Sequence, residues 1–151
     1  MYKNGKIALA SDHGGFGLKG QIADYLRENG VKFVDFGTDS RESCDYPDYA
    51  EKACAAVVAG DCDCAILVCG TGIGMSIAAN KIHGIRAACC SDTFSARFTR
   101  MHNDANALCL GERVCGAGLA LDIVELFLTT EFESGGRHSA RLAKINNIEN
   151  K

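Results

Sequence analysis

The feature that most constrains the fold is a regular alternation of five short, uninterrupted apolar runs with longer amphipathic segments. Strands of a parallel sheet are covered by helices on both faces, so they read as continuous apolar runs. Each run is followed by a segment with helical spacing, which is typical of repeated strand–helix units. We therefore expect five parallel strands, at residues 6–11, 31–36, 64–69, 86–91 and 106–111.

Helices are expected between the strands and after the last one. Leu18, Ile22 and Leu26 recur every four residues and form one apolar helix face. The only proline, Pro47, stands where a helix can begin, and Asp92 can cap the helix after the fourth strand. The remaining predicted helices begin at Met75 or cover 119–128 and 138–150. Together these elements predict an α/β fold: a three-layer α/β/α sandwich with a Rossmann-like, five-stranded parallel sheet.

Length and charge restrict the class of protein. The 151 residues suit one domain, and no linker, repeat or low-complexity segment divides the chain, so we expect a single domain over 1–151. A net charge of −3 gives no bulk attraction to nucleic acid or an anionic membrane. No apolar run approaches the roughly 20 residues of a membrane helix, and we find no signal peptide. The expectation is a cytoplasmic protein that binds neither nucleic acid nor membrane.

The nine cysteines and four histidines do not form a recognisable metal or disulfide framework. The cysteine number is odd, no C-x-x-C spacing occurs, and most cysteines lie in apolar runs such as AACCS and NALCLG. A free cysteine in such a run acts as a small apolar residue. The histidines are scattered and lack the carboxylate spacing of a dedicated site, so no metal is expected. Cys69 differs from the other cysteines because it ends the third strand, directly before three alternating glycines.

Polar residues that follow the strands are the candidate ligand-binding residues, because ligands bind beyond the carboxyl ends of the strands in open α/β sheets. Asp12 and His13 follow the first strand, residues 69–74 the third, and Glu112 and Arg113 the fifth. The loop after Phe36 and the pair Ser91 and Asp92 follow the other two strands.

The segment CGTGIGMSIAANK, which starts at Cys69, admits several interpretations. A dinucleotide site needs G-x-G-x-x-G, and Met75 holds the third glycine position, although Asp92 stands where a ribose-binding acid would be. A P-loop needs Lys-Ser or Lys-Thr after the glycines, and neither is present. An anion cradle would use converging backbone N–H groups and the positive end of the following helix. The structural alternative is a tight turn without a ligand.

A thiol at the mouth of such a loop suggests proton-transfer chemistry. The start of a helix favours the thiolate form of a cysteine. A thiolate beside an oxyanion cradle can remove a carbon-bound proton while the cradle stabilises the resulting enediolate. The alternative is that Cys69 is one more buried cysteine of the core.

Further polar residues could converge on this loop. RMHNDAN places His102 and Asn103 before the fifth strand, and GGRHSARL places Arg137 and Arg141 near the C-terminus. The two arginines are four residues apart and share one helix face, which suits a phosphate. Each residue also has an ordinary alternative: a solvated arginine, a surface histidine or, for Asp12, a helix cap.

Six segments together resemble the ribose-5-phosphate isomerase B family, which also includes isomerases of allose and galactose phosphates. They are SDHGGFGLK, DYPDYA, CGTGIGMSIAANK, GIRAA, HNDANALCLG and GGRH, in order and over nearly the whole chain. The resemblance implies interconversion of ribose 5-phosphate and ribulose 5-phosphate without a metal or other cofactor. It also implies a homodimer or tetramer with active sites between subunits, and a C-terminal helix, about 138–150, that packs on a neighbouring subunit.

The resemblance also implies roles in the chemistry. Cys69 is expected to be the base that moves the proton between C1 and C2, because the glutamate that some relatives use instead is Met75 here. His102, helped by Asp12, is expected to open the furanose ring. The enediolate cradle is expected to consist of Thr71 and the amides of Gly70, Gly72 and Gly74.

Substrate-binding residues follow from the same resemblance. The phosphate clamp is expected to consist of His13, Arg113, Arg137 and Arg141. Asn103 and Tyr46 are expected to line the sugar site. His102, Asn103 and Arg113 would come from the neighbour of the subunit that supplies Cys69.

Two alternatives stay open. The same chemistry could act on a six-carbon substrate such as allose 6-phosphate, or less readily galactose 6-phosphate, since relatives of that type differ in the HNDAN and GGRH segments. A protein of a different class, a non-catalytic sugar-phosphate or nucleotide-binding module, could use the same fold.

Overall fold

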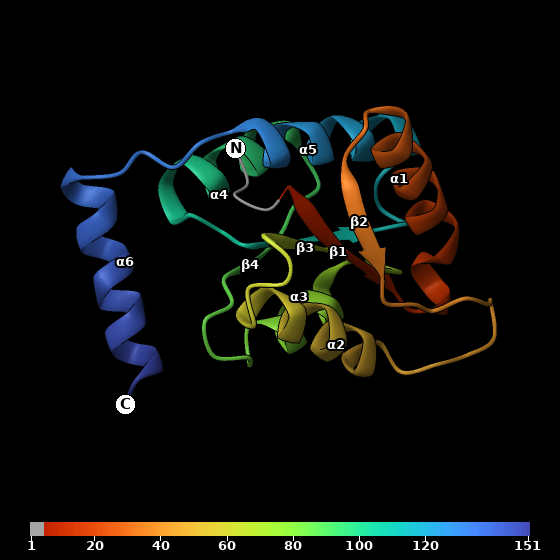
Figure 1. Cartoon of the computed structure of the whole chain (residues 1–151), viewed down its shortest axis with the longest axis horizontal. Coiled ribbons are helices and arrows are strands. Elements are labelled where there is room, and N and C mark those ends of the chain that lie inside the picture. The colour runs from red at the N-terminus through yellow and green to blue at the C-terminus, as the bar shows by residue number, and fades with distance from the viewer. Residues whose placement is uncertain (1–4) are drawn as a thin grey trace.

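The structure, a computed structural model, describes residues 5–151 and contains a five-stranded sheet in which every pairing is parallel (Figure 1). The strands are β1 (Lys6–Ser11), β2 (Lys32–Asp35), β3 (Cys64–Cys69), β4 (Ala87–Cys89) and β5 (Ala107–Gly111). Their order in the sheet is β2-β1-β3-β5-β4, so β3 is central and pairs with β1 and β5. The parallel sheet expected from the apolar runs is confirmed.

Helices cover both faces of the sheet, which confirms the α/β/α sandwich (Figure 1). They are α1 (Phe16–Glu28), α2 (Tyr46–Val58), α3 (Ile73–Ala79), α4 (Thr93–Asn103), α5 (Ala117–Thr129) and α6 (Gly136–Glu149). Alternate residues of β3 point to opposite faces. Ile66 and Val68 pack in one core with α1, α4 and α5, whereas Leu67 and Cys69 pack in another with α2 and α3. Within residues 5–151, no helix has both the length and the apolar character needed to span a bilayer.

The two edge strands are shorter than the sequence predicts. β2 covers Lys32–Asp35 within the expected 31–36, and β4 covers only Ala87–Cys89 within the expected 86–91. Each pairs with a single neighbour, β1 or β5 respectively. The apolar runs therefore locate both edge strands, but the length of each strand depends on how many of its residues hydrogen-bond to the one neighbouring strand.

Local signals explain where two helices begin. α3 begins at Ile73, two residues before the expected Met75, because Gly72 has a φ of +79° and turns the chain into the helix. Asp92 caps α4 as expected, since its carboxylate accepts a hydrogen bond from the Ser95 amide at 2.7 Å.

The C-terminal helix α6 stands apart from the sandwich (Figure 1). It contacts α4, and its last turn meets the loop before β4, where the Gly84 amide donates to the Glu149 carboxylate at 2.9 Å. His138 is its only buried residue, whereas the apolar side chains of Ile145 and Ile148 are 43% and 68% exposed. A cleft of about 500 Å³ lies between α6 and the body, and Arg86, Asn103 and Ile148 are among its lining residues. α6 therefore presents uncovered apolar surface.

Candidate active site

The carboxyl ends of β1, β3 and β5 meet at one edge of the sheet. Ser11 is paired with Val68, and Cys69 with Gly111, so the residues after each strand start from neighbouring positions. The Glu112 amide donates to the Cys69 carbonyl at 2.9 Å, and the Asp12 amide to the Val68 carbonyl at 3.3 Å. The segments that the sequence singles out after these three strands are therefore brought together.

The glycine loop is packed so tightly that a side chain at Gly72 or Gly74 would collide with neighbouring atoms. A Cβ on Gly72 would lie 2.9 Å from the carbonyl carbon of Leu110, and one on Gly74 would lie 2.8 Å from the ring of Tyr46. A Cβ on the facing Gly111 would lie 2.6 Å from the carbonyl carbon of Thr71. Glycine is thus required for packing of this turn, whether or not the loop also binds an anion.

Cys69 lies at the base of this loop and is 4% exposed. The Gly72 amide donates a hydrogen bond to its Sγ at 3.1 Å. An N–H donor stabilises a thiolate more than a thiol, because the negative charge strengthens the bond. The hydroxyl of Thr71 is nearby on the exposed side of the loop and accepts from the Ile73 amide at 3.3 Å.

The other eight cysteines all lie within the described residues and form no disulfide there, and most of them are buried. Burial raises the pKa of Cys54 and of Cys90 to about 12, and raises the pKa of Cys109 well above its ordinary value. These thiols stay protonated and act as small apolar residues of the core, as the apolar runs predict. Cys44 is half-buried and Cys89 is exposed, so these two are the most accessible thiols in this structure.

Asp12 and His13 begin a short 3-10 helix, η1 (His13–Gly15). Asp12 caps it: the carboxylate is buried and accepts from the Gly15 amide at 3.1 Å, which agrees with the alternative that the sequence offers for this residue. The ring of His13 accepts from the Cys44 amide through Nδ1 at 3.2 Å. A neutral His13 ring therefore carries its proton on Nε2 and can donate it to an anion.

Arg113 reaches the glycine loop from its own chain. Its guanidinium lies 3.5–3.6 Å from the position of a Cβ on Gly70, and its amide donates to the Gly70 carbonyl at 3.1 Å. The family resemblance implies that a neighbouring subunit supplies this side chain, and that expectation needs correction. The reason is the strand order, since β5 lies directly beside β3.

A buried lysine, which was not predicted from the sequence, supports the loop over this site. Lys19 is 4% exposed, and its ammonium lies 2.7 Å from both carboxylate oxygens of Asp35 and 2.6 Å from the Thr38 carbonyl. These contacts tie α1 to the start of the loop that leads to Cys44 and Tyr46. The signal in the sequence is weak: a lysine directly after Leu18, next to the apolar face of a helix.

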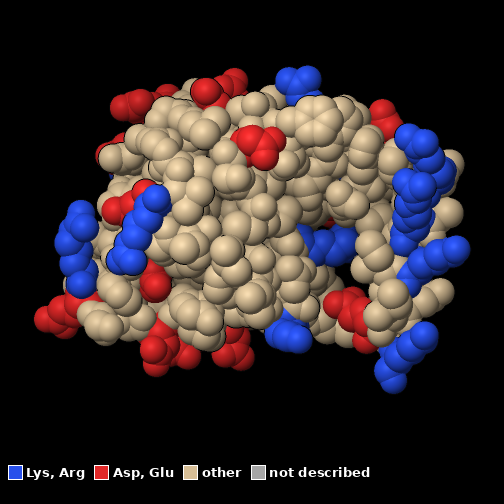
Figure 2. Space-filling view, turned by 180° about the vertical axis from the view of Figure 1, so that it is seen from behind, with Lys and Arg blue, Asp and Glu red and all other residues tan. Residues whose placement is uncertain are grey.

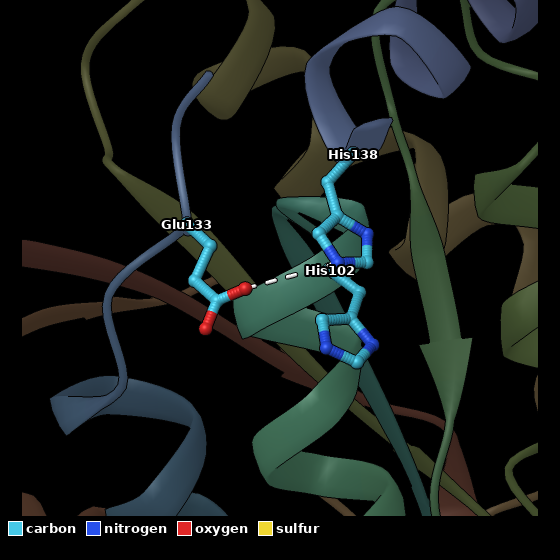
Figure 3. A group of neighbouring side chains, drawn as sticks. All are labelled: His102, Glu133 and His138. Atoms are coloured by element: carbon cyan, nitrogen blue, oxygen red, sulfur yellow. Dashed lines mark ion pairs between the residues drawn. The ribbon is translucent and has the colours of Figure 1, made fainter. Parts of the chain in front are cut away.

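A second cluster of predicted site residues lies where α6 meets α4 (Figure 3). The rings of His102 and His138 are stacked, with centroids 4.1 Å apart and planes within 6° of each other. The carboxylate of Glu133 lies 3.7 Å from His138 Nε2. Arg137 and Arg141 are exposed on α6, where lysine and arginine side chains gather along one edge of the molecule (Figure 2).

This second cluster is at the opposite edge of the sheet from Cys69. α4 runs back against the strands, and its last residues lie beside the amino ends of β4 and β5. Arg86, just before β4, donates to the carbonyls of Asn103 and Asp104 at 3.1 and 2.8 Å. One copy of the chain therefore does not bring His102 and Asn103 to its own Cys69.

His102, Glu133 and His138 also form the one possible metal-ligand group among the described residues, with ligand atoms within 4.8 Å of one another. The histidines are scattered along the sequence, but the expectation that they form no group is wrong for His102 and His138, because helix packing brings these two into contact. Parallel rings direct their nitrogen lone pairs into two separate planes, which does not suit one ion. The Arg137 guanidinium also places a positive charge beside His138, with its Nε 3.4 Å from His138 Nε2, and this charge would repel a metal ion bound there. The arrangement as it stands does not fit a metal.

Comparison with known proteins gives consistent matches along the chain. Residues 7–145 match the model of the Ribose/Galactose Isomerase family. Ribose-5-phosphate isomerase B of Escherichia coli is 51% identical, over 95% of this chain and 96% of that protein. D-erythrulose-4-phosphate isomerase of Pectobacterium atrosepticum is 45% identical, over 86% of each. A solved structure of Clostridium thermocellum ribose-5-phosphate isomerase B superposes with a TM-score of 0.94 and is 56% identical, over 96% of this chain and 97% of that one.

Proposed function

Because this chain belongs to the ribose/galactose isomerase family and is a sugar-phosphate isomerase, we propose that it interconverts D-ribose 5-phosphate and D-ribulose 5-phosphate. The observation that carries the proposal is the hydrogen bond from Gly72 to Cys69 Sγ at the base of the glycine loop. A thiolate held in this way is a base next to backbone donors, which an aldose–ketose isomerisation requires.

The reaction moves one proton and one carbonyl group. In the open-chain aldose, Cys69 removes the proton from C2, and the electrons form an enediolate across C1 and C2. The loop amides and the Thr71 hydroxyl stabilise the negative oxygen. The thiol then returns the proton to C1, while O1 is protonated and the O2 hydroxyl loses its proton, which leaves the carbonyl at C2. Substrate and product have the same composition, so the reaction balances without a redox partner.

Ring opening is assigned to His102, and this requires a second copy of the chain. His102 and Cys69 occupy opposite edges of the sheet in one copy, so the proposed site combines Cys69 of one subunit with His102 and Asn103 of another. A symmetric homodimer forms two such sites. The exposed apolar side chains of α6 and its cleft provide surface that a second copy could cover.

The phosphate clamp is divided in the same way. His13 and Arg113 stand at the strand ends beside the glycine loop, whereas Arg137 and Arg141 stand on α6 with His102. Cations from both subunits would fix the phosphate, and through it the register of C1 and C2 against the thiol.

A four-carbon substrate is the second candidate, because the Pectobacterium relative carries the name of a D-erythrulose-4-phosphate isomerase. Six-carbon aldose phosphates and a non-catalytic binding role remain the alternatives from the sequence. Proton NMR in deuterated water separates them when ribose, erythrose, allose and galactose phosphates are supplied in turn. We expect the fastest loss of the C2 proton signal, with ketose formation, for ribose 5-phosphate, and the same rate after dialysis against a chelator. No exchange with any of the four would leave only a binding role.

A further inference from the structure

His138 is the one fully buried residue of α6, and the proposed mechanism gives it no role. It is 7% exposed, at the first turn of α6. Its ring stacks flat on that of His102, which in turn lies 4.8 Å from the ring of Phe98. Figure 3 shows the two imidazoles facing each other, one from each helix. A flat stack leaves the ring of His102 little freedom to tilt.

His138 also holds Arg137. The Arg137 Nε–H donates to His138 Nε2 at 3.4 Å, so this nitrogen accepts and the neutral ring carries its proton on Nδ1. Burial, the neighbouring His102, and the cations of Arg137 and Arg141 lower the pKa of His138, while Glu133 acts in the opposite direction. His138 is consequently neutral near neutral pH, which keeps Nε2 available as an acceptor.

We propose that His138 is a positioning residue that holds the ring of His102 and the side chain of Arg137 at one spacing. This inference rests on the proposed function, in which His102 acts on the sugar ring and Arg137 binds the phosphate. His102 and Arg137 contact opposite ends of one small substrate, so a change in their spacing would displace the sugar relative to the residues that act on it. His138 stacks its ring face on His102 and accepts the Arg137 hydrogen bond through Nε2.

Two substitutions separate these contributions. His138→Phe keeps an aromatic face for His102 and removes the acceptor for Arg137. His138→Gln keeps an acceptor and removes the stacked ring. We expect H138F to raise KM for ribose 5-phosphate about tenfold with kcat nearly unchanged, and H138Q to lower kcat about ten- to hundredfold with KM nearly unchanged. The matched control is His83→Gln, which removes an exposed histidine that contacts Asn150 at the far end of α6, away from His102 and Arg137, and should leave both constants unchanged.

A substrate too short to close a furanose ring adds a second readout. H138Q should turn over such an aldose phosphate at nearly the parental rate, because ring opening is not needed. A merely structural role would lower activity with both substrates alike. Equal effects of H138F and H138Q on kcat and KM, or parental constants for both, would overturn the inference.

Histidine NMR of the parent protein tests the stacking of His138 on His102 independently of an activity assay. The His138 ring should titrate below pH 6.5, and its ring protons should show a nuclear Overhauser effect to those of His102. Absence of both signals would refute the stack even if the variants fail to fold. If the parent shows the stack but does not isomerise ribose 5-phosphate, the proposed function is wrong, and the role assigned to His138 in that reaction falls with it.

Discussion

The amide of Gly72 points at the sulfur of Cys69, 3.1 Å away, across the turn that joins β3 to α3. Gly72 can make this contact because its φ of +79° reverses the chain directly after the strand. The two residues thus form one unit: the glycine conformation supplies the donor, and the strand end supplies the thiol. This contact places the Cys69 sulfur within the glycine loop.

We predict that Cys69→Ala lowers kcat by about 10²–10⁴-fold with little change in KM, because a general base acts mainly in the transition state. Steady-state kinetics with ribose 5-phosphate measure this. Cys44→Ala is the matched control, since it removes an accessible thiol outside the glycine loop.

Chemical labelling tests the same residue independently. Iodoacetamide at neutral pH should modify Cys69 in proportion to the loss of activity, and ribose 5-phosphate should slow both. Peptide mapping that finds the label mainly on Cys44, Cys54 or Cys115 while activity falls would move the base elsewhere, with Asp12 as the first candidate.

Gly72→Ala should destabilise the protein by about 2–4 kcal/mol. A non-glycine residue at this φ costs about 1–2 kcal/mol, and the added Cβ would lie 2.9 Å from the backbone of Leu110. Gly20→Ala, in the middle of α1 with nothing within 4 Å of the new Cβ, should instead stabilise by about 0.5–1 kcal/mol. Urea unfolding of both variants measures these changes. A Gly72→Ala unfolding midpoint equal to that of the parent would contradict the close packing of Gly72 against Leu110.

Arg113→Ala and Arg141→Ala should each raise KM for ribose 5-phosphate by about ten- to hundredfold, since each loses a charge-assisted bond worth about 1.5–3 kcal/mol. Arg27→Ala, an exposed arginine of α1 paired with Asp24, is the control and should leave KM unchanged. If KM is unaffected by Arg141→Ala, α6 does not bind the phosphate.

The stability of the fold should fall steeply above pH 9. Burial raises the pKa of Cys54 from 9.0 to about 12, so between these values the thiol ionises in the unfolded chain but not in the folded one. Its contribution to stability is complete below pH 9 and is lost towards pH 12, at about 1.4 kcal/mol per pH unit. Urea unfolding at several alkaline pH values, under reducing conditions, should show a shallower decline for Cys54→Ala. Ile22→Val, which alters core packing without a titrating group, should keep the parental slope.

Mixing two inactive variants should restore activity if sites form between subunits. In a dimer of one Cys69→Ala chain and one His102→Asn chain, one site has both defects and the other has none. Random exchange of subunits should therefore recover about a quarter of the parental activity. Recovery measured after co-refolding, against each variant refolded alone, tests this. No recovery, with mixed dimers demonstrated, would mean that Cys69 and His102 serve the same site within one chain.

Much of the fold could be predicted because its signals are local. The continuous apolar run at 64–69 indicates a doubly covered strand, and Asp92 before an amphipathic segment indicates a capped helix, without knowledge of what each packs against. The same holds for the candidate loop: Cys69 followed by alternating glycines marks a strand end, a turn and a helix start. The extent of the edge strands β2 and β4 was less predictable, because it depends on a single neighbour in the sheet.

The sequence by itself determined the parallel sheet, the strand end that carries Cys69 and the tight turn after it, because apolar periodicity and glycine conformation act over a few residues. Only the tertiary structure decided that Arg113 lies against Gly70 of its own chain, that His102 stands at the opposite edge, and that His138 stacks on His102. Such contacts depend on strand order and helix packing, which bring together residues far apart in the chain. The burial of a whole core selects that arrangement, and no short segment encodes it.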